Sequence, residues 1–159
     1  IGQQPISASP LQMALVAAGV ANGGRIPTPH VAAEIRDAQG ATVQRIEPGV
    51  WKTAMTPQAA AEITTMMVSV VEGGSGTKAR IPGVAVAGKT GTAELVDTTS
   101  PDVVPNDPRN TDAWFVAFAP ADRPRFAVAV ELNGAGHGGA TAAPAARQLL
   151  VAALGTKGG

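Results

Sequence analysis

The sequence predicts an α+β fold in which helices cover an antiparallel β-sheet. Three apolar segments rich in alanine and β-branched residues follow one another at residues 84–95, 113–119 and 125–132, and one short turn at residues 120–124 separates the last two. Strands joined by such a short connection pair antiparallel, because a parallel pair needs a long crossover. Apolar segments with helical spacing lie before and after the three strands, and they supply the helices that cover the sheet.

Two helices are expected before the first of these strands. Ser9 can cap a helix that has Pro10 at its first position and runs to Ala21, and this segment is apolar nearly all round, which predicts a buried helix. Thr56 and Pro57 start the second helix in the same way. We interpret its methionine pair as core filler rather than as a ligand site. Its apolar face, expected in the core, consists of Ile63, Met66, Met67, Val70 and Val71.

A small hairpin with mixed faces is expected between these helices, with its arms at residues 31–36 and 41–46. A last helix is expected at residues 141–154, packed on the sheet. Residues 97–112 contain three prolines among several Asp, Asn and Thr residues, so no regular structure is expected there. We interpret this segment as a solvated loop, with a role in shaping access to a site as the alternative.

The first strand carries polar groups that a purely structural strand does not need. In Lys89-Thr90-Gly91-Thr92 an ammonium, two hydroxyls and a glycine interrupt an apolar run, and strand alternation places both hydroxyls on one face. The glycine lets another backbone or a ligand approach closely. At or near a sheet edge, such a strand can pair with an extended peptide and hold its carboxylate. Lys-Thr-Gly is one of three motifs of serine acyl-transfer enzymes, beside Ser-x-x-Lys and Ser-x-Asn.

The other two motifs are not found in usable form. Ser75-Gly-Thr-Lys78 matches Ser-x-x-Lys in its letters, but a nucleophilic serine should open a buried helix that presents both side chains on one face. Ile81-Pro82-Gly83 prevents a helix from running on from Ser75. We therefore expect that Ser75 is not the nucleophile, and no Ser-x-Asn occurs in the sequence.

The glycine-rich segment 134–139 fits the Gly-x-Gly-x-x-Gly pattern of dinucleotide-binding loops. That function also requires a following parallel strand and an acidic residue about 20 positions further on. No Asp or Glu follows Glu131. We therefore interpret the segment as a turn into the last helix.

The composition excludes several classes of function. Hydrophobic residues make up 45% and charged residues 15% of the chain, which is outside the range of disordered proteins. Twelve acidic residues balance twelve basic ones. The chain therefore lacks the excess positive charge that is typical of nucleic-acid-binding proteins. The absence of cysteine excludes disulfides, thiolate zinc sites and cysteine catalysis. No apolar run reaches the length of a membrane span, so an anchor is expected upstream if the protein has one.

On these residues, the sequence resembles the C-terminal part of the transpeptidase domain of a class B penicillin-binding protein. The resemblance implies the fold shared by these enzymes and the serine β-lactamases. In that family the Ser-x-x-Lys and Ser-x-Asn motifs lie upstream of the segment that matches residues 1–3, so residues 1–159 are expected to lack the nucleophile-bearing part of the domain. The segments that carry the resemblance are Ile1-Gly2-Gln3, Pro10-Leu11-Gln12, residues 21–24, residues 88–94, residues 113–120 and the alanine-rich stretch after Gly138-Gly139.

The resemblance implies a D-alanyl-D-alanine transpeptidase that cross-links peptidoglycan stem peptides through an acyl-serine and is acylated by penicillin and other β-lactams. It assigns Lys89, Thr90, Gly91 and Thr92 to one wall of the catalytic site. The Thr92 N–H is expected to supply one oxyanion donor, the hydroxyls of Thr90 and Thr92 to hold a carboxylate, and Lys89 to supply positive potential. No metal and no organic cofactor is implied.

The resemblance also implies partners and a location. The expected partners are the upstream part of the same domain and proteins of cell division or elongation, and the expected location is the extracytoplasmic face of the membrane, anchored by an upstream segment. Several other functions stay open: a D,D-carboxypeptidase, a serine β-lactamase, a β-lactam sensor, or a non-catalytic scaffold in a cell-wall synthesis complex. The upstream sequence distinguishes the scaffold from the enzymes.

Three further side chains are weaker candidates for substrate binding. Glu94 lies two residues beyond Thr92 and therefore on the same strand face. Trp114 can line a substrate groove, although packing within the sheet is the favoured interpretation. His137 lies on the glycine-rich loop, where we interpret it first as a solvated side chain. His30 has no second histidine or carboxylate beside it in the sequence to form a metal site.

Overall fold

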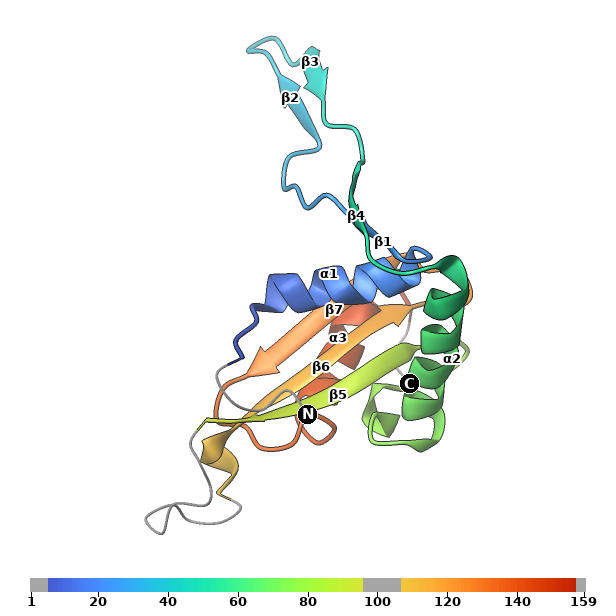
Figure 1. Cartoon of the computed structure of the whole chain (residues 1–159). Helices are drawn as coiled ribbons and strands as arrows, with labels where there is room; N and C mark the ends of the chain where they lie inside the picture. Colours follow the sequence, from blue (N-terminus) through green and yellow to red (C-terminus); the bar gives the residue numbers. More distant parts are fainter. Residues whose placement is uncertain (1–5, 96–106, 157–159) are drawn as a thin grey trace.

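The computed structural model of the chain describes residues 6–95 and 107–156. Its centre is a three-stranded antiparallel sheet of β5 (Ala87–Glu94), β6 (Thr111–Ala119) and β7 (Phe126–Leu132), in that order (Figure 1). The predicted order and antiparallel pairing of the three strands are confirmed. The strand that carries Lys-Thr-Gly-Thr lies at an edge of this sheet.

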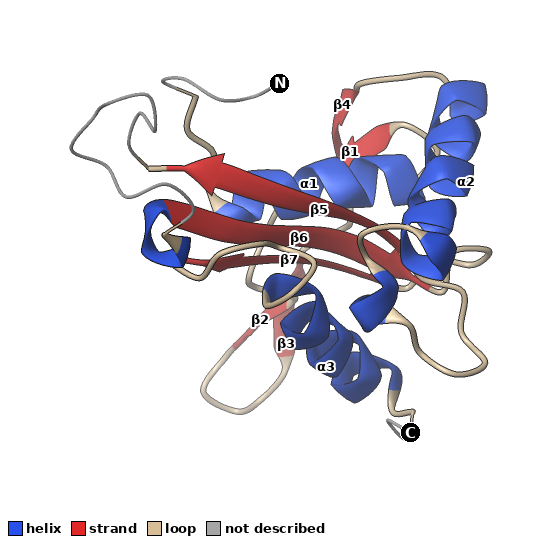
Figure 2. Ribbon diagram, turned by 90° about the horizontal axis from the view of Figure 1, so that it is seen from below, coloured by secondary structure: helices blue, strands red, loops and turns tan. Residues whose placement is uncertain are grey.

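Three helices surround the sheet. Helix α1 (Pro10–Ala21) packs on one face against β6 and β7, and α3 (Ala142–Leu154) packs on the opposite face against the same two strands (Figure 2). Helix α2 (Pro57–Gly73) packs beside β5. This arrangement is the predicted α+β fold, with both faces of the sheet covered by helices.

Side-chain caps fix the starts of the first two helices where the sequence predicts them. The Ser9 hydroxyl accepts the Gln12 N–H at 3.2 Å, and Gln12 Oε1 accepts the Ser9 N–H at 2.7 Å. This reciprocal pair satisfies two backbone donors that would otherwise lack an intrahelical partner. At the start of α2 the Thr56 hydroxyl accepts the Ala59 N–H at 3.2 Å.

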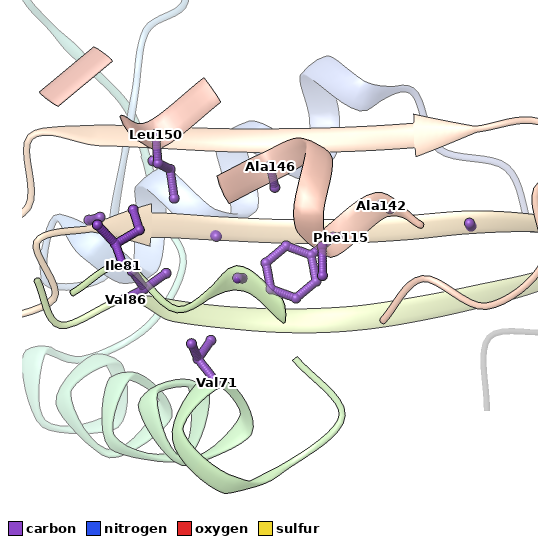
Figure 3. Close-up of a cluster of buried hydrophobic side chains, with 12 residues drawn as sticks. Val71, Ile81, Val86, Phe115, Ala142, Ala146 and Leu150 are labelled. Carbon is purple, nitrogen blue, oxygen red and sulfur yellow. The ribbon is translucent and has the colours of Figure 1, made fainter. Parts of the chain in front are cut away.

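Two hydrophobic clusters form on the two faces of the sheet. In the larger cluster, Phe115 of β6 packs between Val71 of α2 and Leu150 of α3 (Figure 3). In the smaller one, Phe118 packs with Val20 of α1 and with other residues of α2 and β5. Alternation along β6 therefore sends odd-numbered side chains toward α3 and even-numbered ones toward α1.

Two predictions of buried surface are wrong in part. Leu11 and Val16 of α1 are 59% and 48% exposed, although the sequence predicts a helix buried all round. In α2, Met67 is buried but Met66 is 60% exposed. Neighbouring helical residues point about 100° apart, so only one of two adjacent methionines faces the sheet. Apolar character alone does not show which side of a helix meets the rest of the chain.

The predicted hairpin is present and projects from the body of the molecule (Figure 1). It consists of β2 (Glu34–Arg36) and β3 (Thr42–Arg45), and the Asp37 carboxylate closes its turn by accepting the Ala41 N–H at 2.9 Å. A second pair, β1 (Arg25–Pro27) and β4 (Val50–Thr53), connects it to the helices and was not predicted. Strands of three or four residues are too short to show a clear alternation.

The segment 97–112 is only partly as predicted. Residues 96–106 lie outside the described part of the chain, but a 3₁₀ helix, η2 (Pro108–Asn110), follows them, and β6 begins at Thr111. The expectation of no regular structure is therefore wrong for the end of this segment.

A second 3₁₀ helix, η1 (Thr77–Ala79), lies between α2 and β5. Within residues 6–95 and 107–156, the helices are all too short or too polar to cross a membrane.

Candidate active site

Strand β5 turns the backbone polar groups of Thr90 and Thr92 toward its open edge. Just beyond this strand the Leu95 N–H donates to the Asn110 carbonyl on the β6 side, and before it the Ala85 carbonyl accepts the Ala121 N–H, at 2.9 and 2.8 Å. Odd-numbered residues therefore direct their N–H and C=O groups toward β6, and even-numbered residues direct theirs away from it. The Lys89 ammonium donates to the Thr90 carbonyl at 2.9 Å, which agrees with this direction.

The two threonine hydroxyls lie on one face of the strand, as predicted. Thr90 is paired with Phe115, whose ring packs in the larger cluster with residues of α3, and Thr92 is paired with Ala113 of the same cluster. Residues paired across two strands project to the same face. Gly91 is paired with Trp114 and Lys89 with Val116, so these side chains lie on the opposite face.

A hollow of about 510 Å³ lies on the α3 side of β5, and we call it the threonine hollow. His137 reaches it from the glycine-rich loop, so this side chain lies beside Thr90 and Thr92 although it is exposed. The residues that line the hollow carry four hydroxyls, one ammonium and one imidazole. Its lining residues are Gly74, Ser75, Thr77, Lys78, Thr90, Thr92, His137, Gly139 and Ala140.

The sequence analysis did not assign Ser75 to this site, but the structure places it there. Its Oγ lies 2.7 Å from the Thr90 Oγ1, a hydrogen-bond distance between two hydroxyls. The Lys78 ammonium donates instead to the Ala140 carbonyl at 3.4 Å. In the described part of the chain no hydrogen bond joins Ser75 to Lys78.

A second hollow, of about 470 Å³, runs along β5 on the side of Trp114 and around its open edge, where Thr90, Thr92 and Glu94 line it as well. Trp114 lies in its wall with Lys89 and Glu94, and it belongs to neither buried cluster. Trp114 is half-buried, so packing within the sheet and lining a groove both stay open as its role. Gly91 makes room for it, since a Cβ on this glycine would lie 3.0 Å from the Trp114 Cβ. We call this second hollow the tryptophan groove.

The glycine-rich loop packs directly on the backbone of β5 and β6. A Cβ on Gly138 would lie 2.1 Å from the Trp114 carbonyl oxygen and 2.4 Å from that of Gly91. A Cβ on Gly139 would lie 2.2 Å from the Ser75 carbonyl oxygen. These glycines allow close backbone contact with an antiparallel sheet, and residues 6–95 and 107–156 contain no parallel strand pair of the kind that a dinucleotide loop would need.

Hydrogen bonds to η2 and the start of β6 hold the first part of this loop. The Asp112 carboxylate accepts the Gly134 N–H at 3.0 Å, and the Pro108 carbonyl of η2 accepts the Gly136 N–H at 3.0 Å. The Arg109 guanidinium bonds the Asp107 carboxylate and holds its pKa below the usual range, and the same bond raises the pKa of Arg109. The end of segment 97–112 is therefore part of the support of the site.

Comparison with known proteins identifies relatives of this chain. The family model "Penicillin binding protein transpeptidase domain" matches residues 1–151. The peptidoglycan D,D-transpeptidase PbpA of Mycolicibacterium smegmatis is 40% identical over 161 residues, covering 97% of this chain and 31% of the relative. The peptidoglycan D,D-transpeptidase MrdA of Acinetobacter baumannii is 33% identical over 146 residues, covering 89% and 22%.

A solved structure agrees with the fold. The ceftriaxone acyl-enzyme complex of penicillin-binding protein A from Mycobacterium tuberculosis superposes with a TM-score of 0.83 at 38% identity, covering 97% of this chain and 34% of the other. The chain thus spans about a third or less of the length of the relatives it matches. With the family model matching nearly all of its residues, the chain belongs to the penicillin-binding protein transpeptidase family.

Proposed function

We propose that the chain forms one wall of the catalytic site of a peptidoglycan D,D-transpeptidase, with the nucleophile on the upstream part of the same domain. The observation that carries the proposal is the arrangement of Thr90 and Thr92 on β5. Both direct their N–H groups to the open edge of the sheet, and both line the threonine hollow. An edge strand of this kind can pair with an extended acyl-peptide.

The proposed reaction is acyl transfer through an upstream serine. The serine attacks the penultimate D-Ala carbonyl of one stem peptide, the terminal D-Ala leaves as an amine that takes up a proton, and an amine of a second stem peptide then displaces the serine. The Thr92 N–H stabilises the oxyanion of each tetrahedral intermediate, together with a donor on the upstream part. β-Lactams react in the first step, because attack of the serine opens their ring and acylates the same residue.

The side chains of β5 hold the substrate during these steps. The hydroxyls of Thr90 and Thr92 donate to the terminal carboxylate, and the Lys89 ammonium supplies positive charge beside the edge. Lys89 is exposed and its Nζ lies 2.9 Å from the Thr90 carbonyl oxygen, so the charge already lies next to the strand that the peptide would join. Lys89 also stands close enough to this edge to assist proton transfer.

The proposal includes the location and the partners of the whole protein. Peptidoglycan is assembled outside the cell membrane, so the domain would lie on the extracytoplasmic face, anchored by an upstream segment. The exposed apolar side chains Leu11, Val16 and Met66 would be covered by the upstream part of the domain. Proteins of cell division or elongation would be the further partners.

The test is acylation of the full-length protein by a fluorescent penicillin. We expect Lys89→Ala to lower the second-order rate constant of acylation by about 100-fold or more, because it removes a charge from the site while the packing residues of β5 stay. Lys52→Ala is the matched control, since Lys52 is an exposed lysine on β4, in the strand pair that connects the projecting hairpin to the helices. An unchanged rate in Lys89→Ala would overturn the assignment of β5 to the site.

A further inference from the structure

We propose that Ser75 is a positioning residue that orients the hydroxyl of Thr90 for carboxylate binding. In this arrangement Ser75 donates its proton to the Thr90 Oγ1, and Thr90 directs its own proton into the threonine hollow. The inference rests on the proposed function, in which Thr90 holds a substrate carboxylate. It names a residue that lies 15 positions from Thr90 in the sequence and outside the Lys-Thr-Gly-Thr motif.

Proton counting decides the direction of this hydrogen bond. The two oxygens lie 2.7 Å apart, so one of the hydroxyls donates to the other. Each hydroxyl has one proton and two lone pairs. If Thr90 donated to Ser75, no proton would remain for a carboxylate, which can only accept. Carboxylate binding by Thr90 therefore requires Ser75 to be the donor, and the two aligned bonds polarise each other.

The backbone around Ser75 holds it in place. Gly74 and Gly76 both donate their N–H groups to the Val70 carbonyl of α2, at 3.1 and 3.0 Å. From the other side, Gly139 passes so close that a Cβ on it would lie 2.2 Å from the Ser75 carbonyl oxygen. A segment fixed at both sides loses little conformational entropy when its side chain bonds Thr90. Ser75 is exposed, but its backbone is held on both sides in a position from which its hydroxyl reaches Thr90.

Gly139 also passes near Thr90 itself. A Cβ added to Gly139 would come within 3.4 Å of the Thr90 Cγ2, so the methyl group of Thr90 faces the glycine-rich loop while its hydroxyl faces Ser75. As a β-branched residue Thr90 has few χ1 rotamers, and this orientation keeps its hydroxyl at the border of the threonine hollow.

The experiment compares two β-lactams that differ only in their carboxylate. Full-length wild-type protein and its variants are acylated with a penicillin and with the methyl ester of the same penicillin. Ser75→Ala is expected to lower the ratio of the two rate constants, acid over ester, by about 3- to 10-fold, the loss that one hydrogen bond produces. A general structural defect would lower both rate constants together and leave the ratio unchanged.

Comparing Ser75→Thr with Ser75→Val separates the loss of the hydroxyl from any folding defect, because both variants change the shape of the side chain in the same way. The two side chains have the same shape, but only threonine has a hydroxyl, so we expect the ratio to be restored in Ser75→Thr and to stay low in Ser75→Val. A double-mutant cycle with Thr90→Val completes the test. Once Thr90 has lost its hydroxyl, Ser75→Ala should lower the ratio no further.

Besides an unchanged ratio in Ser75→Ala, two results would overturn the inference. One is an equal acid-to-ester ratio in Ser75→Thr and Ser75→Val, and the other is full additivity of Ser75→Ala with Thr90→Val. Failure of the proposed function would look different, because wild-type protein would then not be acylated by either compound. An acylated wild type whose ratio is unaffected by Ser75→Ala would reject only the role of Ser75.

Discussion

Thr92 combines a side-chain role and a backbone role in one residue, and these can be separated by substitution. Thr92→Val keeps the N–H and loses the hydroxyl, so we expect acylation by penicillin to fall by about 10-fold, as for loss of one charge-assisted hydrogen bond. Thr92→Pro also removes the N–H and is expected to abolish acylation. The rates are measured on full-length protein, with Thr65→Val on the exposed face of α2 as control. Equal, mild effects of both changes would mean that this N–H does not face the reacting oxygen.

The close packing of the glycine-rich loop on the sheet depends on Gly138. A Cβ at this position would lie 2.1 Å from the Trp114 carbonyl oxygen, so we expect Gly138→Ala to lower the free energy of unfolding by about 2 kcal/mol. Gly73→Ala at the end of α2 is the control, because nothing lies within 4 Å of the position of its Cβ. Urea unfolding of both variants measures the difference. Equal stability of the two would show that the loop can move away from the sheet at no cost.

At the residue scale, the sequence predicts the groups that lie within one motif and misses those that meet only in the fold. Strand alternation is enough to place the hydroxyls of Thr90 and Thr92 on one face. Ser75 reaches Thr90 only because the segment after α2 returns beside β5. His137 and Trp114 likewise meet their neighbours in the two hollows only in the fold, because those neighbours come from other elements.

At the scale of elements, η2 supports the glycine-rich loop and has a charge pair that can be titrated. The bond from Arg109 lowers the pKa of Asp107 in the folded state relative to the unfolded state. The stabilisation is therefore complete above the unfolded pKa and is lost as the pH falls through the folded pKa. We expect Arg109→Gln to raise the pKa of Asp107, which ¹³C NMR of the side-chain carboxyl group measures. An unchanged pKa would show that the pair does not form in solution.

The helices and the three long strands could be predicted because each has a cap or a sustained apolar pattern. Ser9 and Thr56 start their helices as predicted, and the sheet has the predicted order. The strands β1 and β4 and the outward faces of α1 and α2 could not be predicted. Whether these residues pair as strands, and which helix faces are buried, depends on tertiary contacts that a local sequence pattern does not contain.

At the scale of the whole molecule, the proposed function places the nucleophile on the upstream part of the domain. We expect the 159-residue chain by itself to form no covalent adduct with penicillin and to be poorly soluble, since it exposes Leu11, Val16 and Met66. Coexpression with the upstream part should give a soluble complex that is labelled on the other fragment. Intact-mass spectrometry and gel fluorescence measure both outcomes. An adduct on Ser75 would contradict the expected chemistry, and a monodisperse, cooperatively folding chain would contradict the expected packing.

The position of Trp114 in the tryptophan groove has an optical consequence. The chain has two tryptophans and no tyrosine, so nearly all its emission on excitation at the indole band comes from Trp51 and Trp114. Trp51 is 64% exposed on β4, in the strand pair below the projecting hairpin. In the complex with the upstream part, replacing Trp51 with phenylalanine leaves Trp114 as the one tryptophan of residues 1–159, against the bare backbone of Gly91. Its emission maximum should shift to shorter wavelength when a peptide paired with the open edge of β5 displaces water from the tryptophan groove.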